Sequence, residues 1–255
     1  MISSLLAGLT AGQIVFLLLT AFVAGLARGF SGFGAALIFV PLAGATISPK
    51  LAAPILLMID NVAAAALLPG AWRRAERSDV GVMALGAVLG VPLGAFALDR
   101  LPAISVRWGI AALALALLAL LMSGWRYRGR PRIGATITVG GVAGFCSGVA
   151  QLGGPPVVAY WLGRETRADT TRANIILYFA VSSVLTTASY LVAGLLTIMV
   201  LALSALTGPA YGVGLALGAQ VFGRARDATF RRVSYALIAI AAIASLPALD
   251  AALGR

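Results

Sequence analysis

The chain of 255 residues contains no histidine, one cysteine and only eight acidic residues. Zinc sites are built mainly from histidine and cysteine, and a disulfide needs two cysteines. An internal disulfide is therefore excluded and a zinc site is implausible. The sequence also lacks the Walker A, HExxH and GxSxG patterns of nucleotide-binding, metalloprotease and serine-hydrolase sites. We expect no metal, no cofactor and no enzymatic activity.

Charged residues are scarce too, at 11% of the chain against 61% hydrophobic residues, and the mean hydropathy is +1.00. A soluble domain carries about 25% charged residues, which cover the outer faces of its helices. Here the charges gather in short clusters separated by apolar runs of roughly 20 residues, the length with which an α-helix crosses a bilayer. Because a helix satisfies its own backbone hydrogen bonds in lipid, the sequence predicts an all-α polytopic membrane protein.

The apolar runs between charged clusters and glycine-rich breaks predict the helical segments. Segments 33–47 and 153–163 are short for a membrane span, and each follows a break in which glycine would end a helix. We expect the chain to turn at both breaks, which gives two broken or re-entrant helix pairs, each followed by three transmembrane helices. The predicted segments are 11–27, 33–47, 51–71, 80–98, 104–124, 133–148, 153–163, 172–192, 195–222 and 230–249.

The two breaks are related to each other by an internal repeat. Positions around the first break recur 119 residues later, and a second set of positions recurs 124 residues later. Matched broken helices are typical of transporters built from two repeats. The sequence predicts a first transmembrane repeat over 1–124, a basic linker over 125–132 and a second repeat over 133–255. The matched positions are Ala24, Gly25 and Gly29 with Ala143, Gly144 and Gly148, then Gly34 with Gly153, and Gly94, Ala95 and Arg100 with Gly218, Ala219 and Arg224.

The basic residues predict the orientation of the repeats. If each broken pair enters and leaves on one side, three further crossings per half invert the second repeat. The loops 72–79, 125–132, 164–172 and 223–232 then share one side and hold 14 arginines, against four basic residues opposite. This bias predicts cytoplasmic loops in a bacterial inner (plasma) membrane, with both termini outside, and it explains the net charge of +11 without nucleic acid. Complete crossings would give the same count. The four opposite residues are Lys50, Arg100, Arg107 and Arg255.

The motifs at the breaks also carry a family resemblance. The first break contains 24–34 (AGLARGFSGFG), and the second contains 143–148 (AGFCSG) and 153–156 (GGPP). Together with Pro41 and with Gly90, Gly94 and Arg100, they resemble the TauE/SafE sulfite exporter family of membrane transporters over essentially the whole chain. The resemblance implies transport of small sulfur-containing anions such as sulfite, sulfonates or sulfoacetate. The second break has Ala150-Gln151 where the first has Ser31-Gly32.

The starts of segments 33–47 and 153–163 are candidates for an anion site. A helix start presents unpaired N–H groups and the positive end of its dipole, and glycine lets a ligand approach the backbone. In an inverted repeat the two starts meet near the bilayer midplane. The alternative is that the glycines only allow close helix packing. The candidate substrate-binding residues at the breaks are Arg28, Gly29, Ser31, Gly32, Phe33, Gly34, Gln151, Gly153, Gly154 and Pro155.

Arg28 and Asp60 are the ionisable residues deep in predicted apolar segments. A charge at the bilayer centre costs at least about 2.5 kcal/mol, so each should have a partner. The Arg28 guanidinium is suited to bidentate binding of a sulfite or sulfonate, and its alternatives are a structural ion pair or a position at an interface. Asp60 is a candidate for proton coupling, for the counter-ion of Arg28, or for a surface position.

Asn174 and Tyr178 are further polar candidates, because their spacing of four residues puts them on one face of segment 172–192. The equivalent face of the first half carries Ile55 and Ile59, so the polar pair belongs to one half only. The two side chains would either line the substrate pathway or bond to a neighbouring helix.

The predicted function is a secondary transporter of a small sulfur-containing anion, with the lipid bilayer as its other partner. An anion channel would use the same site without alternating access. A membrane scaffold or an intramembrane enzyme is disfavoured, because such enzymes usually carry histidine, cysteine, paired acids or a Ser–Lys dyad within their spans. The sequence leaves open the substrate, the direction of transport, the coupling ion and a homo-oligomeric state.

Overall fold

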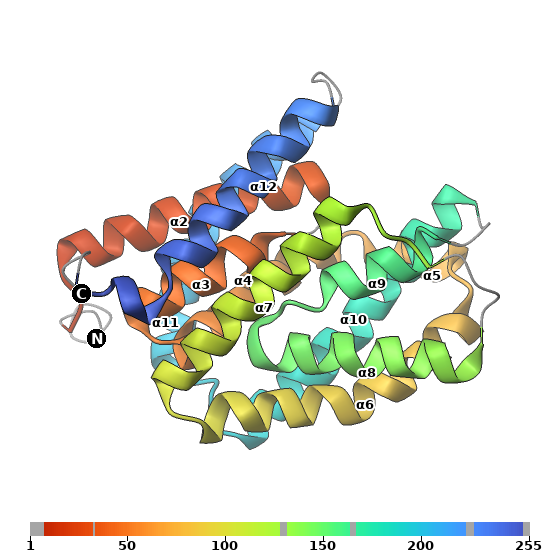
Figure 1. Ribbon diagram of the computed structural model, residues 1–255, viewed down its shortest axis with the longest axis horizontal. Helices are drawn as coiled ribbons and strands as arrows, with labels where there is room; N and C mark the ends of the chain where they lie inside the picture. Colours follow the sequence, from red (N-terminus) through yellow and green to blue (C-terminus); the bar gives the residue numbers. More distant parts are fainter. Residues whose placement is uncertain (1–7, 33, 128–131, 164–166, 223–226, 252–255) are drawn as a thin grey trace. The chain divides into compact units, whose positions relative to one another are not determined.

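The computed structural model describes residues 8–32, 34–127, 132–163, 167–222 and 227–251, and Figure 1 traces their path. Within these ranges the chain forms eleven α-helices and one short 3-10 helix, with no strand. The helices are α2 (Ala11–Ser31), α3 (Ala35–Ile47), α4 (Pro49–Ala65), α5 (Leu68–Arg74), α6 (Arg77–Arg100), α7 (Ala103–Ser123), α8 (Ile133–Ala150), α9 (Gly154–Trp161), α10 (Ala168–Val192), α11 (Ile198–Phe222), α12 (Asp227–Ala244) and η1 (Pro247–Leu249).

The helix lengths confirm a polytopic α-helical membrane protein. Among the described residues, six helices are long and apolar enough to cross a membrane, and a seventh span results if α4 and α5 count as one bent span. Helix α3 is shorter, as expected for the segment after the first break, and α9 is shorter still. The orientation of the two repeats in the membrane stays a prediction.

The structure differs from the predicted segments over 51–71, where the chain forms two helices with a bend of 68° instead of one. Pro69 explains the break, because it has no N–H to donate to the carbonyl four residues earlier. The last turn before it is tighter than an α-helix, because the Leu67 N–H donates to the Ala64 carbonyl, three residues earlier, at 3.0 Å. The sequence signal was the Pro69-Gly70 pair inside an otherwise apolar run.

The helices belong to two compact units, which do not coincide with the two sequence halves. Unit 1 consists of Met1–Ile59, Leu101–Leu118 and Leu195–Arg255, and unit 2 of Asp60–Arg100 and Ala119–Gly194. Unit 1 therefore combines α2 and α3 with α11 and α12, whereas unit 2 combines α6 with α8, α9 and α10. Each unit takes helices from both halves of the sequence.

Glycines bring α2 and α11 together in unit 1. A Cβ added to Gly25 would overlap the Tyr211 carbonyl, and a Cβ added to Gly29 would lie 2.8 Å from the Ala219 nitrogen. On the facing helix, a Cβ added to Gly214 or to Gly218 would likewise overlap a backbone carbonyl of α2. The two backbones are therefore in direct contact, as small residues allow between membrane helices.

Helices α6 and α8 repeat this arrangement in unit 2, where they run side by side (Figure 1). A Cβ on Gly148 would lie 2.8 Å from the Ala95 nitrogen, and a Cβ on Gly94 would overlap the Phe145 carbonyl. In the internal repeat, Gly148 corresponds to Gly29 at a shift of 119, and Ala95 corresponds to Ala219 at a shift of 124. The contact of Gly148 with Ala95 therefore matches the contact of Gly29 with Ala219, and the contact of Gly94 with α8 matches that of the α11 glycines with α2. The internal repeat thus extends from the sequence to equivalent helix contacts, with one partner from each half.

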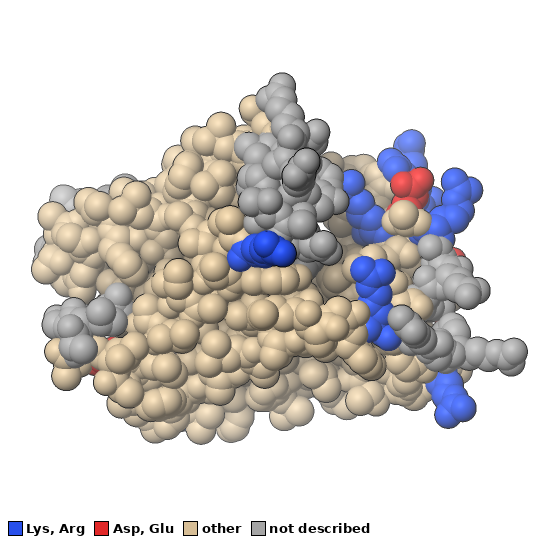
Figure 2. All heavy atoms as spheres, turned by 45° about the horizontal axis from the view of Figure 1, so that its top comes forward, with Lys and Arg blue, Asp and Glu red and all other residues tan. Residues whose placement is uncertain are grey.

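Basic side chains gather at one end of unit 2 (Figure 2). Arg73 and Arg74 lie in the last turn of α5, and Arg77 begins α6, where its guanidinium stacks 5.2 Å from the Trp72 ring centre. Arg172 lies near the start of α10, which packs against α5. This grouping supports the prediction that loops 72–79 and 164–172 face the same side of the membrane.

The glycine contacts of α8 generate a matched pair of variants. A Cβ at Gly140 would meet the Met83 backbone closer than 3.0 Å, whereas a Cβ at Gly141 would meet its nearest atom at an ordinary 3.6 Å. Either substitution gains about 1 kcal/mol of helix propensity, but the overpacking that alanine causes at residue 140 costs about 1–3 kcal/mol. We expect Gly140→Ala to lower the melting temperature of the purified protein in detergent, and Gly141→Ala to leave it unchanged or raise it. Equal melting temperatures would contradict the packing described for α6 and α8.

Candidate functional site

The first break lies between α2 and α3 and is built on two left-handed glycines. Helix α2 ends at Ser31, and the N–H of Gly32 donates to the Arg28 carbonyl at 2.8 Å. The φ angles of Gly32 and Gly34 are 75° and 102°, in the region where a side chain is strained. The sequence folds this way because glycine at the C-cap ends the helix and a second glycine redirects the chain.

Arg28 lies in the last turn of α2 and is half-buried, and its Nη1 donates to the Gly32 carbonyl. A cation at the C-terminal end of a helix is favoured by the dipole and by the carbonyls that the helix leaves unpaired. A Cβ on Gly32 would meet no atom of the described residues within 4 Å, so these residues leave the space beside this glycine open. Arg28 and Gly32 therefore lie together at the break. Phe33 and the side chain of Ser31 lie outside the described residues.

The second break, between α8 and α9, also begins with a left-handed residue, but Gly153, the counterpart of Gly34, has a φ of -69° and is not left-handed. Gln151 occupies the position of Gly32 and adopts a left-handed φ of 60°. Its N–H donates to the Ser147 carbonyl at 2.9 Å, and the N–H of Leu152 donates to the Cys146 carbonyl at 3.1 Å. The bond between Gln151 and Ser147 closes a left-handed turn of the kind that usually has glycine at this position. The Gln151 side chain also donates through Nε2 to the Ser147 carbonyl at 3.0 Å.

The start of α9 offers fewer hydrogen-bond donors than the start of α3. Pro155 and Pro156 follow Gly154 directly and have no N–H, whereas α3 begins with Ala35 and Ala36. Gly153 is also in close contact with α8, because a Cβ there would lie 2.6 Å from the Ala143 carbonyl oxygen. Gly153 is therefore packed against α8, whereas the described residues leave open space beside Gly32 at the first break.

Gly29 likewise has a packing role. The space that its side chain would need is filled by the backbone of α11 at Leu215 and Ala219. Gly148, its counterpart, faces Val91 and Ala95 of α6 in the same way. Both glycines lie directly before a break, so the ends of α2 and α8 are held by close helix contacts.

Asn174 and Tyr178 are both buried and both bond to neighbouring elements of unit 2. The Asn174 Oδ1 accepts a hydrogen bond from the Glu76 N–H at 2.7 Å, just before α6 begins. The Tyr178 hydroxyl donates to the Gly140 carbonyl of α8 at 3.1 Å. These contacts support the second of the two alternatives, in which the pair bonds to a neighbouring helix.

Two further tyrosines, which the sequence did not single out, also bond to α8. The Tyr190 hydroxyl donates to the Gly148 carbonyl at 2.8 Å, and the Tyr160 hydroxyl lies 2.5 Å from the Thr136 hydroxyl. Both tyrosines are buried. Together with Tyr178 they hold α8, whose end forms the second break. No local motif marks them, because their partners are backbone carbonyls or lie on another helix.

Asp60 is half-buried in α4 and, among the described residues, is the only acid away from the ends of a long apolar segment. Arg28 belongs to unit 1, whereas Asp60 begins unit 2. The predicted ion pair between them stays a prediction. Within the described ranges, no group of three or more cysteine or acidic side chains could hold a metal ion.

The left-handed Gln151 leads to a stability prediction. Alanine would keep the strained φ, which costs about 1–2 kcal/mol, and would lose the side-chain bond to Ser147. Glycine would remove the strain. We expect Gln151→Gly to melt at a higher temperature than Gln151→Ala. As a control, Ala150→Gly in the last turn of α8 should lower the melting temperature. The reverse order at residue 151 would show that the turn is not left-handed.

The comparisons with known proteins give one match. The family model described as Sulfite exporter TauE/SafE matches residues 17–245 of the chain. The matched stretch includes both breaks and all the candidate residues described above. No curated protein and no solved structure matches the chain.

Proposed function

Because the chain belongs to the sulfite exporter TauE/SafE family, we propose that it is a secondary transporter of a small sulfur oxyanion such as sulfite or a sulfonate. The family is one of membrane transporters, and the six to seven candidate spans agree with that role. The family match over 17–245 is the observation that carries the proposal. The transporter would lie in the plasma membrane of a bacterium, with cytoplasmic arginine-rich loops.

We assign the main anion contacts to the first break. The Arg28 guanidinium already donates to a neutral carbonyl at Gly32, and a charged oxyanion is a stronger acceptor than a carbonyl. The open space beside Gly32 leaves room for such an anion. The N–H groups at the start of α3, after Gly34, would supply further donors without a side chain in the way. Gly29 would hold α2 in place, and Ser31 and Phe33 would complete the pocket.

The second break has a supporting role in this proposal. Its helix start carries two prolines after Gly154, which reduces the number of N–H donors available to an anion. Gln151 keeps an amide at the turn, and an amide can bind an oxyanion without adding charge. Gly153, Asn174 and Tyr178 would maintain the shape of unit 2, since each has a packing or hydrogen-bond partner there.

Transport would be driven by an ion gradient, because the sequence has no nucleotide-binding motif. A carboxyl group within a membrane segment is the usual carrier of a coupled proton. Asp60 is the acid in that position among the described residues. We therefore propose that Asp60 couples anion transport to protons.

The role of Arg28 is tested by uptake of labelled sulfite into proteoliposomes that contain the purified protein. Arg28→Ala should reduce the initial rate at least tenfold, and Arg28→Lys should give an intermediate rate, because lysine keeps the charge but not the bidentate geometry. Arg77→Ala, which removes an exposed arginine at the start of α6, is the matched control and should transport normally.

Wild-type rates in both Arg28 variants would exclude the site at the first break. The same assay with sulfate, thiosulfate, taurine, isethionate and sulfoacetate as competitors would identify the substrate class. If neither these compounds nor unlabelled sulfite reduced the uptake of labelled sulfite, the result would contradict the sulfur-anion assignment.

The coupling role of Asp60 is tested by the pH dependence of the same uptake. In the wild type, an imposed proton gradient should change the sulfite uptake rate, because proton movement contributes to the driving force. Asp60→Asn keeps the shape of the side chain but cannot release a proton, so its uptake should not respond to the gradient. An unchanged response in Asp60→Asn would remove this residue from the coupling mechanism.

A further inference from the structure

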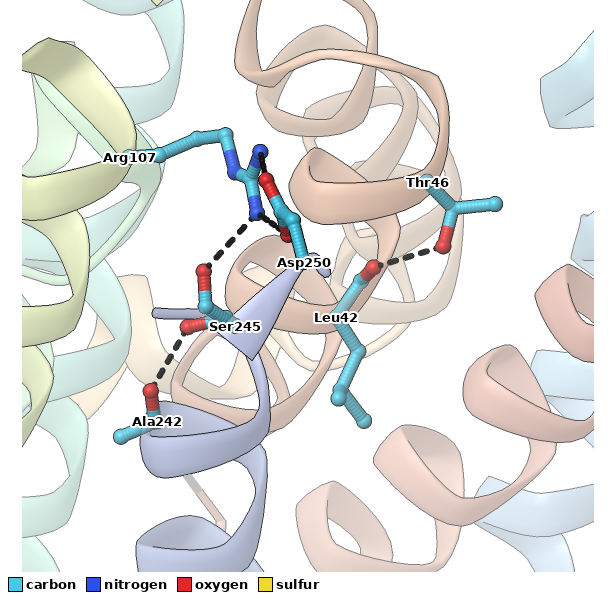
Figure 3. Close-up of polar contacts among 6 residues, drawn as sticks. All are labelled: Leu42, Thr46, Arg107, Ala242, Ser245 and Asp250. Atoms are coloured by element: carbon cyan, nitrogen blue, oxygen red, sulfur yellow. Dashed lines mark hydrogen bonds and ion pairs between the residues drawn. The ribbon is translucent and has the colours of Figure 1, made fainter. Parts of the chain in front are cut away.

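Unit 1 contains an ion pair that joins α7 to the turn after α12. The Arg107 guanidinium donates from Nη1 to Asp250 Oδ2 at 2.8 Å and from Nη2 to Asp250 Oδ1 at 2.7 Å (Figure 3). Its Nη2 also donates to the Ser245 carbonyl at 3.2 Å. Both charged side chains are largely shielded, with 15% of Arg107 and 25% of Asp250 exposed. The two parallel bonds have the geometry in which arginine binds a pair of oxygens of a carboxylate or a phosphate.

One donor of this guanidinium has no acceptor among the described residues. Within them, the Arg107 Nε is buried and makes no hydrogen bond, although both terminal nitrogens do. A buried donor without an acceptor costs free energy, and a pair that served only to join two helices would be expected to satisfy it. The unsatisfied Nε marks the edge of the guanidinium at which another acceptor would bind.

The two partners differ in how firmly they are held. Arg107 lies on α7, a long helix with buried neighbours at Val106 and Ile110. Asp250 directly follows η1, a three-residue turn of which no residue is buried. Elements with few buried contacts open locally at low cost, so the carboxylate can withdraw while the arginine stays in place.

The backbone beside the ion pair is strained. Arg107 lines a narrow hollow together with Gly44, Pro49 and Ser245. Ser48, directly before Pro49, has a φ of 104° and a ψ of 141°, a conformation that is normally restricted to glycine. Strained backbone persists only where the surrounding structure holds it, and it is enriched at ligand clamps and switch regions. The strained turn, the unsatisfied Nε and the displaceable carboxylate therefore meet at one place.

We propose that Arg107 is a second anion-binding residue, in a site that Asp250 closes by taking the position of the anion. A small sulfur oxyanion would displace the Asp250 carboxylate and bind to Arg107 through the terminal nitrogens and Nε. On the predicted topology this site faces the outside, so the anion would bind there before or after crossing the membrane. This inference rests on the proposed function, because it takes the same class of anion.

The test is a titration of the purified full-length protein in detergent with sodium sulfite at constant ionic strength, followed by melting temperature. Asp250→Asn removes the competing charge and keeps the shape of the side chain. It should lower the sulfite concentration of half-maximal stabilisation about tenfold. The double variant Arg107→Gln/Asp250→Asn should lose this gain. Asp99→Asn is the matched control, because Asp99 pairs with an exposed arginine at 3.3 Å, and it should behave as the wild type.

A purely structural ion pair would give a different result. Asp250→Asn would then lower the melting temperature without changing the sulfite concentration of half-maximal stabilisation, and this would overturn the proposal. An equal gain with chloride in place of sulfite would overturn it too. If Asp250→Asn does not fold, Asp250→Glu, whose longer side chain disturbs the bidentate geometry, should shift the sulfite response in the same direction by a smaller factor.

The experiment also separates this proposal from the one for the first break. Titration of Arg28→Ala with and without Asp250→Asn isolates the response at Arg107. If the first break binds no anion, the gain from Asp250→Asn persists in the Arg28→Ala background. If Arg107 binds no anion, Asp250→Asn gives no gain in either background, whereas the uptake defect of Arg28→Ala remains.

Discussion

Direct contact between helix backbones is the constraint on which the rest of this structure depends. In lipid there is little hydrophobic driving force between helices, so association relies on close packing, and glycine allows the closest approach. The pairs α2–α11 and α6–α8 are built in this way. Gly29 and Gly148 are the last packing glycines of α2 and α8, and each lies directly before a break. The same contacts that hold the helices together therefore fix where the chain turns.

The sequence predicted the helical segments and both breaks, because these depend on local composition: apolar runs, glycine and proline. It missed the bend at Pro69, since a single proline was outweighed by the surrounding apolar residues. The left-handed Gln151 had no local signal either. The pairing of helices across the two halves could not be read from the sequence, because tertiary contacts decide it. The bonds of Asn174 and Tyr178 are likewise tertiary.

The two breaks both end a helix at a left-handed residue, but they differ in the backbone that follows and in their chemistry. The first combines Arg28, two left-handed glycines and open space at Gly32. The second has no arginine in its last turn, and its Gly153 is packed against α8. Matched positions of the two sequence halves thus make equivalent helix contacts, while the chemistry of the two breaks is unequal. This inequality leads us to assign the main anion contacts to unit 1, which also contains Arg107 and Asp250.

The central claim is that the protein carries a sulfur oxyanion by alternating access. Counterflow tests it most directly: proteoliposomes preloaded with unlabelled sulfite are diluted into a trace of labelled sulfite, with no other gradient. A carrier exchanges one anion for another, so the account predicts that labelled sulfite transiently accumulates inside above its external concentration. Labelled sulfite that only equilibrates, as through an open pore, or that does not enter at all, would contradict the account.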